Sequence, residues 1–492
     1  MTKRPADLFD REQEWADLDG FATSRAPGLQ LGIVSGRRRQ GKSYLLRRLV
    51  AAHGGLYSLA LEEERRPALQ RFGRDVAGAL GVPGELRFTD WTEALRTAIG
   101  IGTPGSGRLV VLDEFSYLLR GAPELPSAIQ AVYDEARSDP KATPATLILC
   151  GSAFSVMSEL LSGAHPLRGR ARLDLMVAPF DFRTARLFWG VEDLEVALRL
   201  HAILGGTPGY RDLTDPAPQT MPELDEWLGA HVLNPAHALF GETDYLLRED
   251  PRITDRALYQ SVLAAISAGD TTPAAIAGSL GRDARGLWHA LEVLRSAGFV
   301  TRSEDLLVQR KPAYAVADPI VRFAMLVVRP RQVMYEDRRA AAAWAASQDA
   351  FSARILGPHF EDLARQWTRR FASPATLGGE VSIVGQATIN DPAGRARHEV
   401  DVLALAEGDA QHAKRVRIRA LGEAKSRNRS LGGTELARLE RIRTVLGERG
   451  HDVSQARLLL FSRTGFADGL RAAADARDDV ELVDLDRLYL GE

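Results

Sequence analysis

The sequence predicts an α/β protein made of several domains, and three observations support this. In the first ~190 residues, short apolar segments alternate with helical stretches, which is typical of a parallel sheet covered by helices. A chain of 492 residues is long enough for about three or four domains with separate cores. Hydrophobic residues make up 45% of the chain and charged residues 26%, as in ordinary globular proteins. We therefore expect a parallel α/β domain followed by further globular domains.

Charge and cysteine content narrow the class of protein. The formal net charge is −2, so any affinity for nucleic acid has to come from a local basic face. The single cysteine, Cys150, excludes an intramolecular disulfide and fits a reducing compartment. The first ten residues lack the apolar core of a signal peptide, and no apolar run approaches the ~20 residues needed to span a bilayer. We expect a cytoplasmic protein without a membrane partner.

The loop after the first predicted strand carries a phosphate-binding motif. Residues 36–43 read Gly-Arg-Arg-Arg-Gln-Gly-Lys-Ser and fit the pattern G-x-x-x-x-G-K-[ST]. Phosphate oxygens need backbone N–H groups that approach closely, which explains Gly36 and Gly41. Lys42 is expected to reach the β- and γ-phosphates, and Ser43 to ligate Mg²⁺. Because a strand (29–34) and a helix (43–52) flank the loop, we prefer an ATP site to a chance match.

Acidic and polar residues follow two further predicted strands. Asp113 and Glu114 end the apolar segment 109–112, and Ser152 follows the segment 147–150. Asp113 is expected in the Mg²⁺ shell, and Glu114 is expected to polarise the attacking water. Ser152 is placed where a polar side chain can contact the γ-phosphate. The alternative is an ordinary acidic strand end.

These motifs together resemble a known family. The segment 8–14 with Arg11 and Glu12, the loop 36–43, the strand end 112–114 and the run 205–208 resemble the archaeal-type ATPases of the signal-transducing (STAND) P-loop group, relatives of AAA+ proteins. With the Asp-Pro segment 317–323, the resemblance covers about two-thirds of the chain. It implies that Arg11 and Glu12 lie near the nucleotide and that Pro208 senses it from a helical lid.

The last ~140 residues contain a second candidate site. Glu423 and Lys425 are two positions apart on a predicted strand, so both point to the same face. Asp401 lies on the neighbouring strand and Glu361 on the preceding helix, and these carboxylates suit Mg²⁺. Lys425 would then orient or deprotonate the attacking water. The element order resembles the restriction-endonuclease-like fold; the alternative is an ion pair at a strand end.

The segment 256–330 predicts a winged helix. Three helices (257–268, 272–280 and 283–297) precede two short strands around 299–302 and 313–317. Arg282, Arg285, Trp288 and His289 lie near the front of the third helix, where DNA contacts are made in such modules. Packing on the nucleotide domain as a conformational reader is the alternative.

The sequence thus predicts five regions: a P-loop ATPase core (1–190), a helical lid (191–255), a winged helix (256–330), a helical connector (331–350) and a restriction-endonuclease-like domain (351–492). The predicted function is ATP binding and hydrolysis, coupled to a C-terminal domain that binds DNA or cleaves it with Mg²⁺. The alternative is a nucleotide-driven switch whose C-terminal domain is catalytically silent. The motifs are compatible with a monomer, a dimer or a ring, so a homo-oligomer is among the allowed states.

Two sets of site residues follow. The predicted catalytic residues are Lys42, Glu114, Asp401, Glu423 and Lys425, and the predicted metal ligands are Ser43, Asp113, Glu361, Asp401 and Glu423. The predicted nucleotide-binding residues are Arg11, Gly36, Arg37, Arg38, Arg39, Gln40, Gly41, Lys42, Ser43, Tyr44, Asp113, Ser152 and Pro208.

Overall fold

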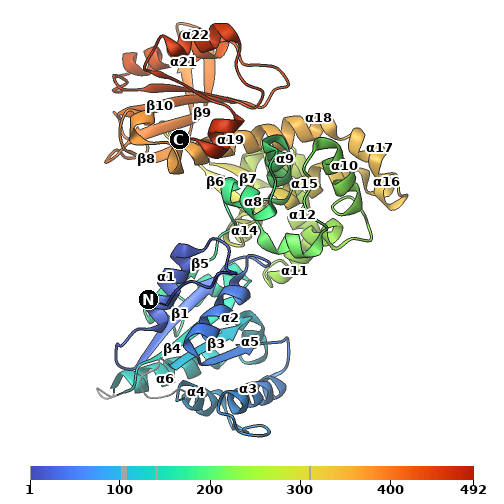
Figure 1. Ribbon diagram of the computed structural model, residues 1–492, viewed down its shortest axis with the longest axis vertical. Coiled ribbons are helices and arrows are strands. Elements are labelled where there is room, and N and C mark those ends of the chain that lie inside the picture. Colours follow the sequence, from blue (N-terminus) through green and yellow to red (C-terminus); the bar gives the residue numbers. More distant parts are fainter. Residues whose placement is uncertain (1, 101–107, 139–141, 310–311) are drawn as a thin grey trace.

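The computed structural model describes residues 2–100, 108–138, 142–309 and 312–492. Figure 1 shows an N-terminal α/β domain at one end, a C-terminal α/β domain at the other, and mainly helical segments between them and to one side. No helix in these ranges is both long enough and apolar enough to cross a bilayer.

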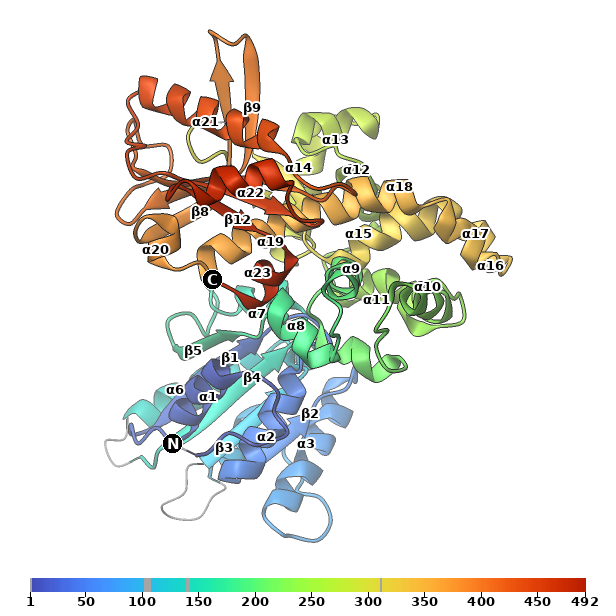
Figure 2. The ribbon, with the colours of Figure 1, turned by 45° about the horizontal axis from the view of Figure 1, so that its top comes forward.

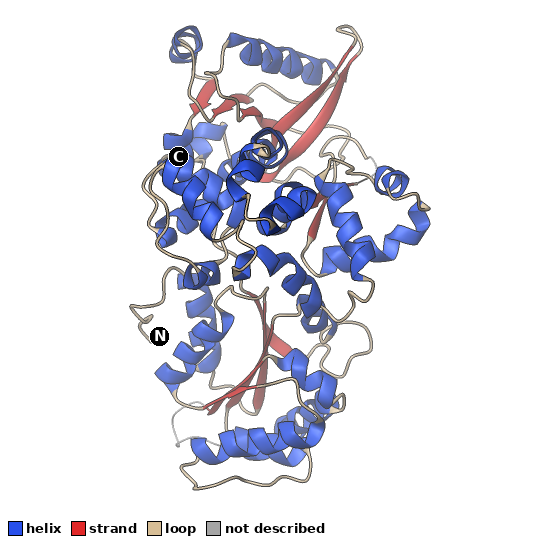
Figure 3. Ribbon diagram, turned by 90° about the vertical axis from the view of Figure 1, so that its right-hand side faces the viewer, coloured by secondary structure: helices blue, strands red, loops and turns tan. Residues whose placement is uncertain are grey.

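The N-terminal domain is built on a parallel sheet with the order β2-β3-β4-β1-β5. Every residue of β1 and β4 is buried, as expected when helices cover both faces of a sheet (Figure 3). The parallel α/β fold predicted for this region is confirmed. Its strands are β1 (Leu29–Ser35), β2 (Leu56–Leu59), β3 (Arg108–Asp113), β4 (Ala145–Gly151) and β5 (Ala171–Met176). Its helices are α1 (Glu12–Ala22), α2 (Lys42–His53), α3 (Arg65–Ala79), α4 (Trp91–Ile99), α5 (Phe115–Gly121), α6 (Leu125–Ser138) and α7 (Phe154–Glu159).

The helical region that follows the sheet begins at residue 182, before the predicted boundary at 191, and we call residues 182–255 the lid. A 3₁₀ turn, η1 (Pro208–Leu213), interrupts it directly after the Gly-Gly pair at 205–206. Its apolar side chains belong to one core that continues into the following helices. The helices are α8 (Phe182–Trp189), α9 (Leu194–Leu204), α10 (Met221–Ala230) and α11 (Glu242–Glu249), with a second 3₁₀ turn, η2 (Ala238–Gly241).

Three helices and an antiparallel hairpin occupy the segment where a winged helix is predicted. They are α12 (Arg256–Ser267), α13 (Pro273–Ser279), α14 (Ala284–Ser296), β6 (Val300–Ser303) and β7 (Ala313–Val316). Short helical pieces then lead to the last domain, and the winged-helix assignment itself stays a prediction. These pieces are α15 (Pro319–Phe323), η3 (Ala324–Val328), η4 (Arg329–Arg331), α16 (Gln332–Glu336), α17 (Ala340–Ala345), α18 (Gln348–Phe351) and η5 (Ser352–Leu356).

The C-terminal domain has a mixed sheet with the order β12-β11-β10-β9-β8. The β8–β9 and β9–β10 pairs are antiparallel, whereas the β10–β11 and β11–β12 pairs are parallel. The β8–β9 hairpin extends beyond the rest of the domain in Figure 2. The strands are β8 (Val381–Asp391), β9 (Ala396–Ala406), β10 (Ile418–Lys425), β11 (Arg457–Ser462) and β12 (Val480–Val483). The helices are α19 (Gly357–Arg370), α20 (Pro374–Leu377), α21 (Gly433–Glu448), α22 (Asp468–Asp475) and α23 (Leu485–Leu490).

The C-terminal domain packs on the lid through specific contacts. The Arg183 guanidinium of α8 donates to the Leu488 carbonyl of α23 at 2.7 and 2.9 Å. In the same interface, Nδ1 of His201 (α9) lies 2.9 Å from Nε2 of His359 (α19), and burial lowers the pKa of both imidazoles. One apolar core runs through this junction, so the lid and the C-terminal domain are joined firmly.

Candidate functional site

The loop between β1 and α2 is shaped to surround a ligand. Gly36 and Gly41 have φ angles of 146° and 88°, and Arg39 between them has 65°. A Cβ on Gly36 would lie 2.5 Å from the Val177 carbonyl oxygen, so this position requires glycine. The buried Lys42 side chain reaches back across the loop, and its Nζ donates to the Arg37 carbonyl at 2.9 Å. The loop therefore holds an ammonium against a neutral acceptor.

The ends of β1, β3 and β4 bring the other predicted residues to the same edge. Strand β4 lies between β1 and β3, so Ser152 after β4 stands between Lys42 and Glu114. The Ser152 hydroxyl donates to Glu114 Oε2 at 3.2 Å. Burial raises the pKa of Glu114, the neighbouring charge of Asp113 adds to the rise, and Lys42 opposes it. Glu114 is thus a desolvated carboxylate beside a lysine.

Asp113 lies behind this group. Its side chain is fully buried, Oδ1 accepts from the Glu114 N–H at 2.9 Å, and Oδ2 accepts from the Tyr57 hydroxyl. Tyr57, on β2, was not predicted as a site residue, because its partner is 56 positions away and no motif marks it. Burial, reinforced by the charge of Asp113, raises the pKa of Tyr57, which keeps this hydroxyl a donor.

A cavity of about 760 Å³ opens in front of the loop. Its volume is in the range of small-molecule sites. Ten of the predicted residues line it, whereas Gly36, Arg37, Asp113 and Ser152 do not. The ten are Arg11, Arg38, Arg39, Gln40, Gly41, Lys42, Ser43, Tyr44, Glu114 and Pro208.

One wall of the cavity is aromatic, and it is lined by Phe9, Phe180 and Phe188. Phe9 and Phe188 have ring centroids 5.3 Å apart, and Phe180 and Phe188 are 5.2 Å apart. The Arg11 guanidinium lies 4.5 Å from the centroid of the Phe180 ring and donates to the Ala178 carbonyl at 2.7 Å. A flat ring can stack on such a surface while a phosphate chain extends to the loop. The phenylalanines were missed, since they come from segments about 170 residues apart in the sequence.

The resemblance implies that Arg11, Glu12 and Pro208 all lie near the nucleotide, and the structure differs from this at Glu12. Arg11 lines the cavity, but Glu12 is exposed and pairs with Arg4 at 2.9 Å. Pro208 opens η1 beside the loop, where the Gly209 N–H donates to the Arg39 carbonyl at 2.9 Å. Glu12 therefore faces away from the cavity, while Arg11 and Pro208 border it.

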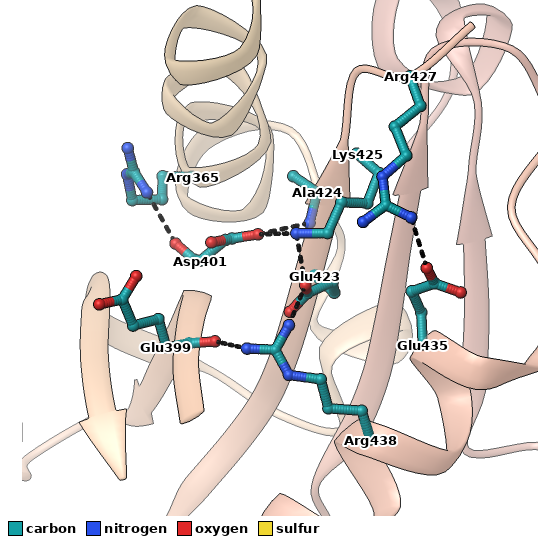
Figure 4. Close-up of polar contacts among 9 residues, drawn as sticks. All are labelled: Arg365, Glu399, Asp401, Glu423, Ala424, Lys425, Arg427, Glu435 and Arg438. Atoms are coloured by element: carbon teal, nitrogen blue, oxygen red, sulfur yellow. Dashed lines mark hydrogen bonds and ion pairs between the residues drawn. The ribbon is translucent and has the colours of Figure 1, made fainter. Parts of the chain in front are cut away.

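The second candidate site lies at the end of β10 (Figure 4). Glu423 and Lys425 share a face, and the Lys425 Nζ lies 2.5 Å from Glu423 Oε1. From β9, Asp401 Oδ2 lies 3.5 Å from the same Nζ and accepts from the Ala424 N–H at 2.9 Å. Burial lowers the pKa of Lys425, but the charges of Asp401 and Glu423 outweigh it, so the net shift is upward. Lys425 is a protonated cation at neutral pH.

A further residue, Arg438 of α21, completes this site. Its guanidinium pairs with Glu423 Oε1 and donates to the Glu399 carbonyl at 2.7 Å (Figure 4). Glu423 is fully buried, and its other oxygen, Oε2, accepts no hydrogen bond from the residues in the structure's described ranges. Sequence reasoning missed Arg438, because one arginine on a charged helix carries no signal.

Glu361 stands near these acids on α19. Burial and the charge of Asp401 raise the pKa of Glu361 to about 7. Among the described residues, no group of three or more His, Cys, Asp or Glu side chains is arranged to hold a metal ion. The free Glu423 Oε2 and the Asp401 carboxylate nevertheless fit a hard cation that takes two carboxylates and water. These carboxylate oxygens suit Mg²⁺, and the Arg438 guanidinium would compete with the cation for Glu423.

With both sites described, comparisons with known proteins identify the class of the first domain. Residues 8–195 match the family model described as an ATPase domain predominantly from Archaea. This part of the chain is therefore similar to archaeal-type ATPase domains.

A sequence relative and two solved structures are also similar to this chain. The uncharacterized protein MJECL04 of Methanocaldococcus jannaschii is 25% identical over 334 residues, covering 67% of this chain and 71% of that protein. The Walker-type ATPase paby2304 of Pyrococcus abyssi is 22% identical, with a TM-score of 0.49, over 66% of this chain and 97% of that one. The ORC2 protein of Aeropyrum pernix, in ADPNP–ADP complexes, is 16% identical, with a TM-score of 0.45, over 70% and 97% of the two chains.

Proposed function

We propose that the protein binds and hydrolyses ATP in the cavity between the sheet and the lid. The observation that carries this is that Lys42 and Glu114 lie at the same edge of the sheet, on either side of the end of β4, and that each is held by a neutral partner. Lys42 would neutralise charge that develops on the phosphates, and Glu114 would orient water and accept its proton. Ser43 and Asp113 would hold the Mg²⁺ that accompanies ATP and stabilises its phosphate charge.

The aromatic wall of the cavity supports a nucleotide rather than a simple phosphate. Phe9, Phe180 and Phe188 line the cavity with rings that contact one another, and a base could stack on them. Arg11 would fix the adjoining backbone, since it spans from the N-terminal segment to the Ala178 carbonyl. Base and phosphates would then be held by separate groups within one cavity.

We further propose that ATP turnover controls a C-terminal domain that binds DNA or cleaves it in a Mg²⁺-dependent step. Asp401 and Glu423 would hold the cation. Glu361 lies close to them, and burial together with the charge of Asp401 raises the pKa of Glu361. Lys425 would orient the attacking water. Arg427 and Arg429 follow Lys425 and are candidates for DNA phosphate contacts.

A specific observation favours the second candidate function, a nucleotide-driven switch with a silent C-terminal domain. The Glu423 carboxylate is neutralised by both Lys425 and Arg438, and a divalent cation would have to compete with them. In this alternative, α14 with Arg282, Arg285 and the half-exposed Trp288 would contact DNA or a protein partner.

The ATP assignment is tested with Lys42→Ala. We expect ATP affinity, measured by titration with a fluorescent ATP analogue, to fall and turnover to be lost. An unchanged ATP affinity in a folded Lys42→Ala protein would contradict the assignment.

Nuclease and switch are separated by incubating single-stranded, duplex and branched DNA with the protein, ATP and Mg²⁺ or Mn²⁺. The nuclease proposal predicts cleavage that Glu423→Ala and Lys425→Ala both abolish. Robust ATP turnover without cleavage of any DNA form would contradict the nuclease proposal and favour the nucleotide-driven switch.

A further inference from the structure

Three consecutive arginines of the phosphate-binding loop reach out of the ATPase core to carboxylates of later segments. Arg37 pairs with Asp318, which precedes α15. The other two reach α11 of the lid: Arg38 pairs with Glu249 at 2.6 Å, and Arg39 with Glu242 through two hydrogen bonds of 2.9 and 3.2 Å. The loop is thus tied to two different elements through charged pairs.

The carboxylates in these pairs are largely removed from solvent. Side-chain exposure is 1% for Glu242, 11% for Asp318 and 16% for Glu249. Burial raises the pKa of Glu249, and the hydrogen bond from Arg38 opposes that rise. A buried carboxylate that loses its cation is strongly destabilised, so these acids favour conformations in which the lid stays on the loop.

Backbone contacts reinforce the same junction. A Cβ on Gly209 would lie 2.9 Å from the Arg39 carbonyl oxygen, and one on Gly206 would lie 1.8 Å from the Phe180 carbonyl oxygen. A Cβ on Gly205 would lie 3.1 Å from the Pro319 ring. The Gly-Gly-Thr-Pro-Gly run at 205–209 therefore packs against the loop, the end of the core and the Asp-Pro segment.

Arg37 links this junction to the phosphate site itself. Its carbonyl accepts the hydrogen bond from Lys42, while its guanidinium pairs with Asp318 and lies 4.5 Å from the centroid of the Phe299 ring. A phosphate oxygen that takes the Lys42 ammonium would compete with that carbonyl. Arg37 therefore connects Lys42 to Asp318, in the segment after the β6–β7 hairpin.

We propose that Glu242, Glu249 and Asp318 are positioning residues of the ATP site. They fix the loop arginines, so that ATP binding at the loop and the position of the lid on it are energetically coupled. This proposal rests on the proposed ATP site and adds the route by which its occupancy reaches the rest of the chain.

The test uses the full-length protein with Glu242→Gln and Asp318→Asn. Arg71→Gln is the matched control, because Arg71 and Glu63 form a comparable two-bond pair (2.6 and 2.9 Å) elsewhere in the ATPase domain. Circular dichroism and thermal unfolding establish that each variant is folded. ATP affinity, kcat, KM and hydrogen exchange with and without ATP analogue are then compared.

We expect about tenfold weaker ATP affinity in Glu242→Gln and Asp318→Asn, the size of a typical coupling between sites. ATP-induced protection of 208–213 and 242–249 should shrink in both variants, and Asp318→Glu should restore it. Arg71→Gln should match wild type in both measurements. If Glu242→Gln does not fold, Asp318→Asn and its Asp318→Glu rescue decide the matter.

The outcomes separate the two proposals. Wild-type affinity and wild-type ATP-induced protection in Asp318→Asn would overturn the positioning role, while Lys42→Ala could still abolish ATP binding. Failure of Lys42→Ala to affect ATP binding would instead overturn the ATP site on which the positioning role rests.

Discussion

The two candidate sites hold their charged groups in opposite ways. In the N-terminal site Lys42 is bonded to a backbone carbonyl and Glu114 to a serine hydroxyl, so each charge faces a neutral partner. In the C-terminal site Glu423 is bonded to two cations, Lys425 and Arg438. A charged side chain that is already paired with an opposite charge attracts a ligand less than one whose only partner is an uncharged group.

This difference predicts how each site meets its ligand. A polyphosphate can replace the Arg37 carbonyl at Lys42 at the cost of one hydrogen bond. A cation at Glu423 has to replace an ion pair on Oε1 or use the free Oε2. A ligand at the N-terminal site therefore exchanges one neutral hydrogen bond, whereas a cation at the C-terminal site competes with two ion pairs on Oε1 or binds the free Oε2.

The largest expected effect comes from removing the charge of Glu114 alone. Glu114→Gln keeps the hydrogen bond to Ser152 but loses the proton acceptor, so turnover should fall about 10²–10⁴-fold. ATP affinity, measured by titration, should stay within about threefold, because Gln removes a repulsive charge near the phosphates. Unchanged turnover would mean that Glu114 is not the base.

Sequence reasoning recovered the parts of both sites that are local in the chain. The loop 36–43 and the Glu423–Lys425 pair are short patterns on predictable strands, so spacing alone places them. The connections between regions were not recovered. Arg37 and Asp318 are 281 positions apart, and Arg183 reaches Leu488 across 305 positions. Such pairs depend on how domains dock, which no local periodicity encodes.

Element boundaries show a similar limit. The predicted helix that carries Glu361 is α19 (Gly357–Arg370), preceded by the short α18 and the π-helical turn η5. Neither β12 nor α23 was predicted, although β12 belongs to the last sheet and α23 to its contact with the lid. Both are short, with four and six residues, so their patterns are too brief to predict.

The next largest effect tests whether the C-terminal site is closed by Arg438. Arg438→Gln leaves the buried Glu423 with Lys425 alone, so the free energy of unfolding should fall by about 2 kcal/mol in urea denaturation. Mn²⁺ affinity, measured by calorimetry, should rise several-fold because Oε1 has lost one competitor. Arg417→Gln, which breaks an exposed pair with Asp409, is the control and should change neither value. Weaker Mn²⁺ binding in Arg438→Gln would show that the arginine supports the site instead of closing it.

A pH effect of similar size is expected at Glu361, whose pKa is raised from 4.5 to about 7. The folded protein then binds this proton more tightly than the unfolded chain, so stability should fall as pH rises from about 4.5 to about 7. Glu361→Gln removes this loss, so its stability advantage over wild type should be about 2.5 kcal/mol larger at pH 8 than at pH 5. Denaturant titrations at the two pH values measure it. A bound divalent cation should reduce the difference, whereas equal gains at both pH values would contradict the raised pKa.

The smallest effect on stability is expected at Arg427, and it shows whether the C-terminal site receives a phosphate ligand at all. Arg427 pairs with Glu435 at 3.1 Å and is half exposed, so Arg427→Ala should change the free energy of unfolding by less than about 0.5 kcal/mol. If DNA phosphates pass over the end of β10, the same substitution should lower the salt dependence of DNA binding by about one charge. Anisotropy titrations over a range of salt concentrations measure this slope. An unchanged slope would place DNA elsewhere and leave the N-terminal cavity as the phosphate-binding site of the chain.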